Sequence, residues 1–503
     1  MRVPFDPPPG ILSNDTIYAI PGAWADCSNM RFREGRAETI GGWAKIFATP
    51  LDGVCRTVYN WTNILGLPNV AFGTHTDLQV YVAGVLATIT PAGLIDGAID
   101  NGDAGTGYGI GYYGLGTYSI PPSVYKLRTW SLDSWGETLL GVPRYGPLYQ
   151  WSNDTGAVAV EIGQAPDIIT AMLVTPERQV LAFGCNEELS GDFNPLCIRG
   201  SDIEDLTDWT TSSSNNAFEH ILEGGGQIVA AHMVETAVGV WTDKGMHVGQ
   251  FVGAPDQTYR FDRVDDNCGA IGPNAVCVLK GTAYWVGPDR QIRAWAFGTK
   301  PSIIPCPIWK DFADHLDMTQ GDKLIAVSNS RFDEVWFFYP DTRDGDENSR
   351  HIMFTIGPDG GPIWSKGDVA RTAASDAGVL LYPQAVSYPG AVYYHEVGTD
   401  ADGSSLAWSI RSAGQYLNEA EQVLQVQRLV PDFKGQENAI AMTLTMRERA
   451  QSAPVTKGPY AITTAATKVD FRASGAIAEV AFAGTDYVRF GKPTFDAVGM
   501  GQR

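Results

Sequence analysis

The chain has 503 residues, 44% of them hydrophobic and 11% aromatic, which is enough apolar material for two or three domains with sizeable cores. Its formal net charge of −21 excludes a protein that wraps DNA by neutralising phosphates. No run of about 18 uncharged apolar residues occurs and the first residues do not resemble a secretion signal, so we expect no membrane segment and synthesis in the cytoplasm.

The 56 glycines and 30 prolines, beside only 18% charged residues, predict short elements joined by tight turns and therefore an all-β fold. The cysteines form no C-x-x-C pair, so we expect reduced, mostly buried thiols without a metal-binding role. They are Cys27, Cys55, Cys185, Cys197, Cys268, Cys277 and Cys306.

The first distinctive element is the segment 21–43. Trp24 and Trp43 lie near its ends, Arg31 and Arg33 lie between them, and Pro-Gly and Gly-Gly turns bound it. No enzyme motif has this form. A basic stretch in an acidic chain suits docking better than catalysis, and we therefore predict a docking segment at the N-terminus.

Short runs rich in aromatic and β-branched residues follow from about residue 57 to residue 400, with turn residues between them and no convincing helix. They include Val70–Thr74, Leu78–Val82, Thr138–Val142, Gln179–Gly184, Ala237–Thr242, Thr282–Gly287, Glu334–Tyr339 and Ala391–Tyr394. Ala-Phe-Gly recurs at Ala71, Ala182 and Ala296, either as a repeat or as the coincidence of a common tripeptide. The region predicts a β-propeller of about six to eight four-stranded blades.

The last part alternates apolar and polar residues more cleanly, as in Ala441–Met446 and Ala478–Phe482. Such alternation is typical of a sheet with one wet face, so we predict an additional C-terminal β-sandwich-like domain. The expected domains are 1–56, the N-terminal docking segment; 57–400, the propeller; and 401–503, the sandwich-like domain.

Other motifs do not indicate chemistry. Gly109-x-Gly111-x-x-Gly114 has no strand before it and no helix after it, so it does not predict a nucleotide site. The acidic run Asp341–Asn348 departs from the calcium loop of a helix-loop-helix site and is predicted to be a solvated hairpin tip. We expect no enzyme activity, cofactor or metal, although a site assembled from several blade loops stays open at this stage.

Several landmarks together resemble the tail nozzle (tail hub, or packaged-DNA stabilisation) proteins of short-tailed, podovirus-type bacteriophages, and they cover nearly the whole chain in order. They are the segment 21–43, Gly114–Tyr118, Trp130–Leu140, Leu148–Trp151, Ala283–Gly287, Ile304–Pro307, Asn329–Phe338, Val430–Phe433, Val469–Arg472 and Phe490–Gly491. One departure is Ala473–Ile477, which stands where a further basic cluster is expected.

The resemblance implies a structural virion protein of the tail. About six copies would form a ring below the portal and its adaptor, or head-to-tail connector, proteins. The ring would be the DNA exit conduit, retain packaged DNA, and carry tail fibres, spikes or a needle. Genomic DNA would pass through the lumen without sequence-specific binding, and an acidic lumen would repel it. The acidity is equally suited to keeping a large assembly soluble.

A ring of identical subunits needs two complementary faces, and Trp and Arg are common interface anchors. Trp24, Arg31, Arg33 and Trp43 are therefore the candidate assembly interface. The alternative is that both tryptophans cover a propeller edge. Two other functions stay open: a receptor- or carbohydrate-binding propeller module, and a propeller enzyme that degrades host polysaccharide.

Overall fold

The computed structural model describes residues 1–16, 19–20, 22–102, 126–254, 257–416 and 423–499. In these residues the chain is all-β, and its helical structure is limited to α2 (Trp309–His315) and the 3₁₀ helix η1 (Met318–Lys323). The expected absence of helix is thus corrected by one short helical connection. The Gly109–Gly114 motif lies outside the described residues.

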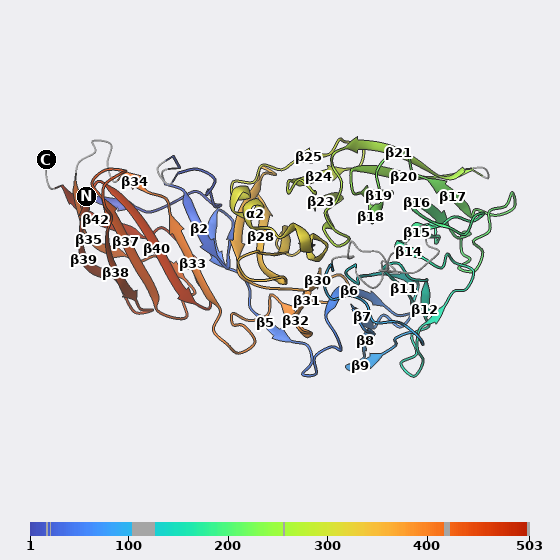
Figure 1. Cartoon of the computed structure of the whole chain (residues 1–503). Helices are drawn as coiled ribbons and strands as arrows, with labels where there is room; N and C mark the ends of the chain where they lie inside the picture. The colour runs from blue at the N-terminus through green and yellow to red at the C-terminus, as the bar shows by residue number, and fades with distance from the viewer. Residues whose placement is uncertain (17–18, 21, 103–125, 255–256, 417–422, 500–503) are drawn as a thin grey trace.

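Seven four-stranded antiparallel sheets stand in a ring (Figure 1). Blade one consists of β6 (Cys55–Thr62), β7 (Pro68–Thr74), β8 (Leu78–Val82) and β9 (Val85–Thr88). Blade two consists of β10 (Trp130–Trp135), β11 (Thr138–Pro143), β12 (Tyr149–Trp151) and β13 (Val160–Glu161). Blade three consists of β14 (Ile169–Val174), β15 (Val180–Asn186), β16 (Phe193–Gly200) and β17 (Phe218–Ile221). Blade four consists of β18 (Ile228–Val234), β19 (Ala237–Thr242), β20 (Gly245–Ala254) and β21 (Gln257–Asp266). Blade five consists of β22 (Val276–Leu279), β23 (Thr282–Val286), β24 (Ile292–Ala296) and β25 (Ser302–Ile303). Blade six consists of β26 (Ile325–Asn329), β27 (Glu334–Pro340), β28 (Asn348–Ile356) and β29 (Pro362–Gly367).

Blade seven closes the ring with a strand from the start of the chain. Its strands are β30 (Ala373–Ser375), β31 (Gln384–Ser387), β32 (Ala391–His395) and β5 (Trp43–Lys45). The first strand of each blade contacts that of the next, and β30 contacts β6, so the circle is complete. The propeller prediction is confirmed, with seven blades in the described chain.

Aromatic side chains fill the spaces between blades. Trp241 of blade four and Trp285 of blade five are fully buried, and their rings meet edge to face at 5.5 Å. Such a pair adds about 0.5–1.5 kcal/mol beyond the area that it buries. The Ala-Phe-Gly repeat is only partly structural: Ala71 and Ala182 lie on the second strands of blades one and three, but Ala296 ends a third strand.

Three further sheets, which we call the distal sheets, lie beside the propeller (Figure 1). The first consists of β1 (Arg2–Pro4), β42 (Thr494–Gly499), β35 (Leu424–Val430) and β39 (Val469–Gly475). The second consists of β2 (Trp24–Ser28), β33 (Ala407–Ser412), β40 (Ile477–Thr485), β37 (Ile440–Arg447) and β38 (Val455–Ile462), and β34 (Gln415–Tyr416) also pairs with β40. The third consists of β3 (Met30–Arg33), β4 (Arg36–Thr39), β41 (Arg489–Phe490) and β36 (Phe433–Lys434).

The distal sheets correct the expected domain boundaries. The alternation in β37 is real, since its buried residues face the core and the intervening ones do not. However, each distal sheet pairs strands from both ends of the chain, and one hydrophobic core joins Phe5 and Trp24 to Phe337 and Trp364 of blade six. Residues 1–56 therefore do not form a unit of their own, and the C-terminal strands do not form a separate sandwich.

The acidic run at residues 341–347 connects β27 to β28, as the hairpin prediction requires, but it is not fully solvated. Asp341 is buried and pairs with Arg343 at 2.5 Å, and Glu347 accepts hydrogen bonds from Arg56. These carboxylates neutralise cations of the chain itself.

Candidate functional site

The predicted docking segment connects the distal sheets to the propeller. It contributes β2, β3 and β4 to the distal sheets and then β5 to blade seven. Gly42 allows this crossing, because a Cβ atom there would lie 2.3 Å from the carbonyl oxygen of Asp400. The segment thus fastens two parts of one chain.

Arg31 on β3 is the centre of this connection. Its buried guanidinium donates to both carboxylate oxygens of Glu396, with Nη1 at 3.1 Å from Oε2, and its Nε lies 3.1 Å from Oε1 of Glu334. Glu334 begins β27 of blade six and Glu396 follows β32 of blade seven. A bidentate arginine pair is geometrically specific, so this cluster sets the position of the distal sheets against two blades. We call Arg31, Glu334 and Glu396 the Arg31 clasp.

Polar neighbours complete the clasp. The side-chain amide of Asn329 donates to Glu334 and to Glu396, each at 3.2 Å, and the indole N–H of Trp336 donates to Glu334 at 3.0 Å. The ring of Phe332 lies 4.2 Å from the Arg31 guanidinium, close enough for a cation–π contact.

The clasp holds two carboxylates against one arginine, and this imbalance affects the titration of Glu334. Burial raises the pKa of Glu334 to about 7; the charge of Arg31 opposes the shift and that of Glu396 reinforces it. Burial alone would lower the pKa of Arg31, but Glu334 and Glu396 together raise it. Arg31 therefore stays charged, and Glu334 gains a proton near neutral pH.

Trp43 fixes the other end of the segment to blade seven. Its indole stacks on the His395 ring at 5.7 Å, and the Arg371 guanidinium lies 4.7 Å over its face. Arg371 Nε also donates to His395 Nε2 at 2.8 Å. Burial, together with the charge of Arg371, lowers the pKa of His395 well below its usual range, which keeps the imidazole neutral as an acceptor.

The four predicted interface residues therefore have different surroundings. Trp24 is buried against Phe5, with ring centroids at 5.4 Å, and Arg31 is buried in the clasp. Burial corrects their predicted role as anchors for another subunit, since neither side chain can reach one. Trp43 is half-buried on the outer strand of blade seven, so its position agrees with the alternative prediction that it covers a propeller edge. Arg33 is exposed.

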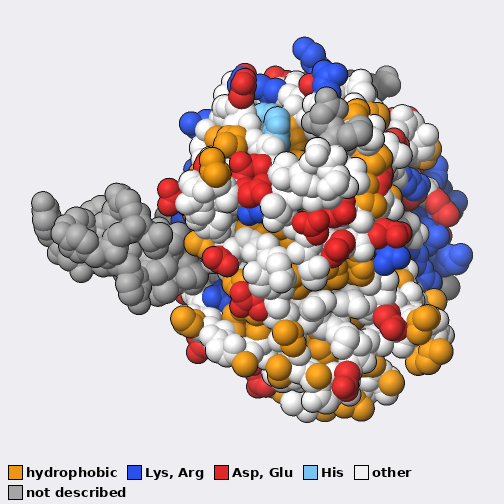
Figure 2. All heavy atoms as spheres, turned by 90° about the vertical axis from the view of Figure 1, so that its right-hand side faces the viewer, with side chains coloured by type: hydrophobic (Ala, Val, Ile, Leu, Met, Phe, Trp, Pro, Cys, Tyr) orange, Lys and Arg blue, Asp and Glu red, His pale blue; other side chains and the backbone are white. Residues whose placement is uncertain are grey.

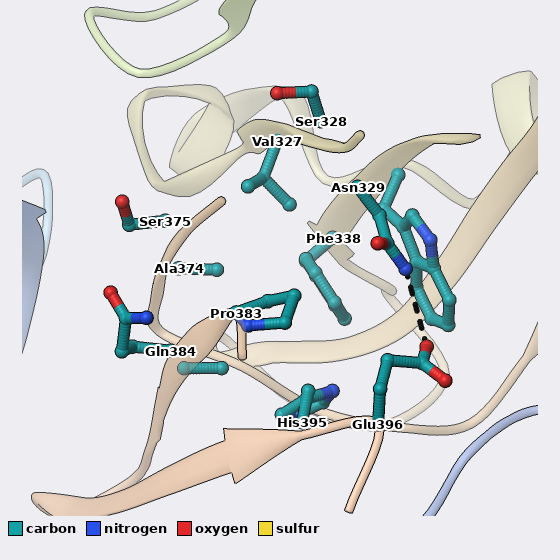
Figure 3. A pocket seen from close by; sticks show the side chains of 12 residues that line it. Val327, Ser328, Asn329, Phe338, Ala374, Ser375, Pro383, Gln384, His395 and Glu396 are labelled. Atoms are coloured by element: carbon teal, nitrogen blue, oxygen red, sulfur yellow. Dashed lines mark hydrogen bonds between the residues drawn. The ribbon is translucent and has the colours of Figure 1, made fainter. Parts of the chain in front are cut away.

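A small cavity lies beside the clasp between blades six and seven (Figure 3). Figure 3 shows Asn329 and Glu396 directed toward each other from neighbouring blades, with Ser375 and Gln384 on the opposite wall. Its volume of about 30 Å³ is the space of one water molecule. Glu396 is the clasp carboxylate that lines this cavity, and the space beside it is too small for a sugar unit.

The central channel of the propeller is the larger cavity, with about 330 Å³ lined by the inner strands of all seven blades. The Asp133 carboxylate accepts hydrogen bonds from the Tyr59 hydroxyl at 2.9 Å and from the Val174 amide at 2.8 Å. These two hydrogen bonds therefore connect blades one, two and three. The volume corresponds to about eleven water molecules, far too little for a DNA duplex.

Metal-ligating side chains and thiols are dispersed over the described residues. In them, no three His, Cys, Asp or Glu side chains are grouped to hold a metal ion, and no helix is long and apolar enough to cross a membrane. Six cysteines are buried and Cys306 is half-buried, which confirms the buried thiols. Burial raises the pKa of Cys27 to about 12 and that of Cys268 to about 11, so these thiols are unreactive.

No protein-family model and no curated protein matches the chain. Among solved structures, it is similar to the β-propeller domain of Cps50 (Swd1) from Myceliophteria thermophila, with a TM-score of 0.39 and 10% sequence identity over 71% of this chain and 98% of that domain. A TM-score this low does not support any conclusion about the fold or the function of this chain. The propeller assignment rests on the seven sheets and the closed circle of their inner strands.

Proposed function

We propose that the chain is a structural subunit of the tail of a short-tailed bacteriophage, in the nozzle or hub ring below the portal and adaptor. The observation that carries the proposal is the place of the family landmarks in the fold. The segment 21–43 and Asn329–Phe338 contribute Arg31 and Glu334 to the Arg31 clasp, Phe471 and Phe490 lie in the core that the distal sheets share with blade six, and Phe433 packs against it. Several of the landmarks within the described residues thus stabilise the fold, whereas the landmark Gly114–Tyr118 lies outside the described residues.

The route for DNA follows from the size of the channel. The central channel of one propeller cannot admit a duplex, so the conduit of the proposed ring lies between subunits. With a net charge of −21, the chain repels a passing polyanion wherever its carboxylates line that conduit. In the proposed ring, DNA therefore passes without sequence-specific binding, and the subunit contributes no enzymatic activity.

Subunit contacts in the proposed ring need exposed apolar surface. Ile64 and Leu65 in the β6–β7 turn are 83% and 79% exposed, and Leu381 in the β30–β31 connection is 75% exposed. The two turns belong to adjacent blades, since the Val379 amide donates to Asn60 of β6. Figure 2 shows hydrophobic side chains toward the lower edge of the molecule and carboxylates across its middle. Apolar turns of this kind are suitable ring contacts.

Sedimentation of the purified chain, together with mass spectrometry of purified tails, tests the proposal. We expect a closed oligomer of defined mass in solution or in the presence of the adaptor, and the chain among the proteins of the tail. A chain that stays monomeric in both conditions and is absent from tails would contradict the proposal.

A further inference from the structure

The small cavity between blades six and seven borders the surroundings of both Arg31 and Trp43. Glu396, which accepts hydrogen bonds from Arg31, lines the cavity. His395, the preceding residue, stacks on Trp43 and lines the cavity as well. A molecule bound in this cavity therefore lies between the two side chains that fix the N-terminal segment to the blades.

Asn329 presents a hydrogen-bond acceptor to the cavity. Its Nδ2 donates to Glu334 and to Glu396, each at 3.2 Å, and this pair of bonds fixes the orientation of the amide. Figure 3 shows the oxygen of Asn329 turned away from Glu396 and into the cavity. Asn329 is 5% exposed, and its Oδ1 has no hydrogen-bond partner among the described residues. A buried carbonyl oxygen of this kind requires a donor.

His395 presents a hydrogen-bond donor to the same cavity. Arginine only donates, so the bond of 2.8 Å from Nε of Arg371 makes Nε2 of His395 the acceptor. Burial and the charge of Arg371 lower the pKa of His395 well below its usual range, so the ring is neutral and carries its proton on Nδ1. Arg371 does not line the cavity, so the ring reaches the cavity with its Nδ1 side. Within the described chain the hydrogen bond of the ring is the one to Arg371, which leaves the Nδ1 proton for the cavity.

The size and the chemistry of the cavity select its occupant. A volume of about 30 Å³ admits one water molecule and no larger ligand. Water accepts from an N–H group and donates to a carbonyl oxygen at the same time, whereas a metal ion cannot accept a hydrogen bond and an anion cannot donate one. The hydroxyls of Ser328 and Ser375 already donate to Asp376. Gln384 accepts from Asn60, so these walls require no further partner.

We propose that the cavity binds one ordered water molecule, which accepts a hydrogen bond from Nδ1 of His395 and donates one to Oδ1 of Asn329. The water joins two groups of hydrogen bonds, that of Arg371 and His395 beside Trp43 and that of Asn329 in the Arg31 clasp. A continuous chain of hydrogen bonds then runs from Arg371 in blade seven through blade six to Arg31. The water site does not depend on assembly of the chain, so its failure would leave the proposed function untouched.

A crystal structure of the full chain, at a resolution that shows ordered water, tests the proposal. We expect one density peak at hydrogen-bond distance, about 2.7–3.2 Å, from both Nδ1 of His395 and Oδ1 of Asn329. Crystals soaked in thallium(I), which replaces monovalent cations, should show no anomalous peak in the cavity. A cavity without density, or an anomalous peak from thallium, would overturn the proposal.

His395→Phe removes the donor and keeps a ring of similar size, so the density peak should be lost. Val327→Ala is the matched control, because Val327 lines the same cavity but offers the water no side-chain hydrogen bond. The peak should remain in this variant. A peak that persists in His395→Phe would contradict the proposed bridge, and the map of the unchanged chain decides the proposal if His395→Phe does not fold.

Discussion

The propeller ring and the distal sheets are both all-β, but they are assembled in opposite ways. Blades one to six are each built from strands that are consecutive in the chain, and aromatic pairs such as Trp241 and Trp285 pack between neighbours. The distal sheets instead pair the two ends of the chain, and the Arg31 clasp attaches them to blades six and seven. The ring is therefore built from pairings that are local in the chain, whereas the distal sheets depend on pairings between its two ends, on the hydrophobic core that they share with blade six and on the Arg31 clasp.

The largest expected effect comes from the clasp. Arg31→Ala leaves Glu334 and Glu396 buried without their cation, which should lower the free energy of unfolding by about 3–5 kcal/mol. Limited proteolysis with mass spectrometry should show both chain ends cut before the blades. Arg33→Ala, in the same hairpin but exposed, is the matched control and should change stability by less than about 0.5 kcal/mol. Equal effects of the two variants would show that the clasp does not hold the distal sheets.

A core substitution in the ring gives the reverse pattern. Leu181 of blade three is fully buried, and Leu181→Ala should lower the free energy of unfolding by about 2–5 kcal/mol, through lost burial and the cavity left behind. Proteolysis should now begin in blades three and four, with the chain ends protected for longer. Early cutting at the chain ends in this variant would mean that the ring and the distal sheets unfold together.

Protonation of Glu334 should distinguish the two sides of the Arg31 clasp, β3 of the distal sheets and β27 of blade six, from the rest of the ring by their response to pH. Its pKa in the folded chain is raised to about 7 from an ordinary value of 4.5, so its stabilising contribution is present below pH 4.5 and is lost as pH rises through about 7. The free energy of unfolding of the distal sheets should therefore fall by about 2–3 kcal/mol between about pH 5 and pH 8. Hydrogen exchange at β3 and β27, compared with β15 of blade three, measures it.

Glu334→Gln is the variant for this prediction, because an amide of the same shape does not titrate. It should flatten the pH dependence at β3 and β27 and leave β15 as before. An unchanged slope in this variant would assign the titration to another group.

The smallest effect on folding is expected at Arg33. Because its side chain is exposed, Arg33→Glu should leave the free energy of unfolding within about 0.5 kcal/mol. If Arg33 faces a neighbouring subunit or the adaptor, the same variant should weaken ring assembly in sedimentation experiments. Assembly equal to that of the unchanged chain would remove Arg33 from the interface.

The blades are predictable from the sequence because their signals are local. Runs such as Leu78–Val82 and Glu334–Tyr339 are strands in the structure, with bounds that differ by at most one residue. The β3–β4 hairpin is local, but the partners of β1, β2 and β5, and the second partner of β4, are not predictable, since they lie hundreds of residues away and no spacing in the sequence indicates the pairing. Hence the sequence predicts a docking segment at residues 21–43, where the structure shows a segment that connects the distal sheets to blade seven.

The sites divide in the same way. Arg31 and Trp24 stand out in the sequence as unusual, but only burial shows that they act within the chain. Glu334 lies inside a predicted strand, yet nothing local marks it as the acceptor for Arg31.

An electron microscopy map of the assembled tail tests the proposed function most directly. We predict a ring of this chain in which the DNA passage lies between subunits, each seven-bladed propeller keeps its narrow central channel, and the distal sheets stay attached through the Arg31 clasp. A map in which the chain is absent from the conduit, or in which DNA runs through the propeller of a single subunit, would contradict this prediction.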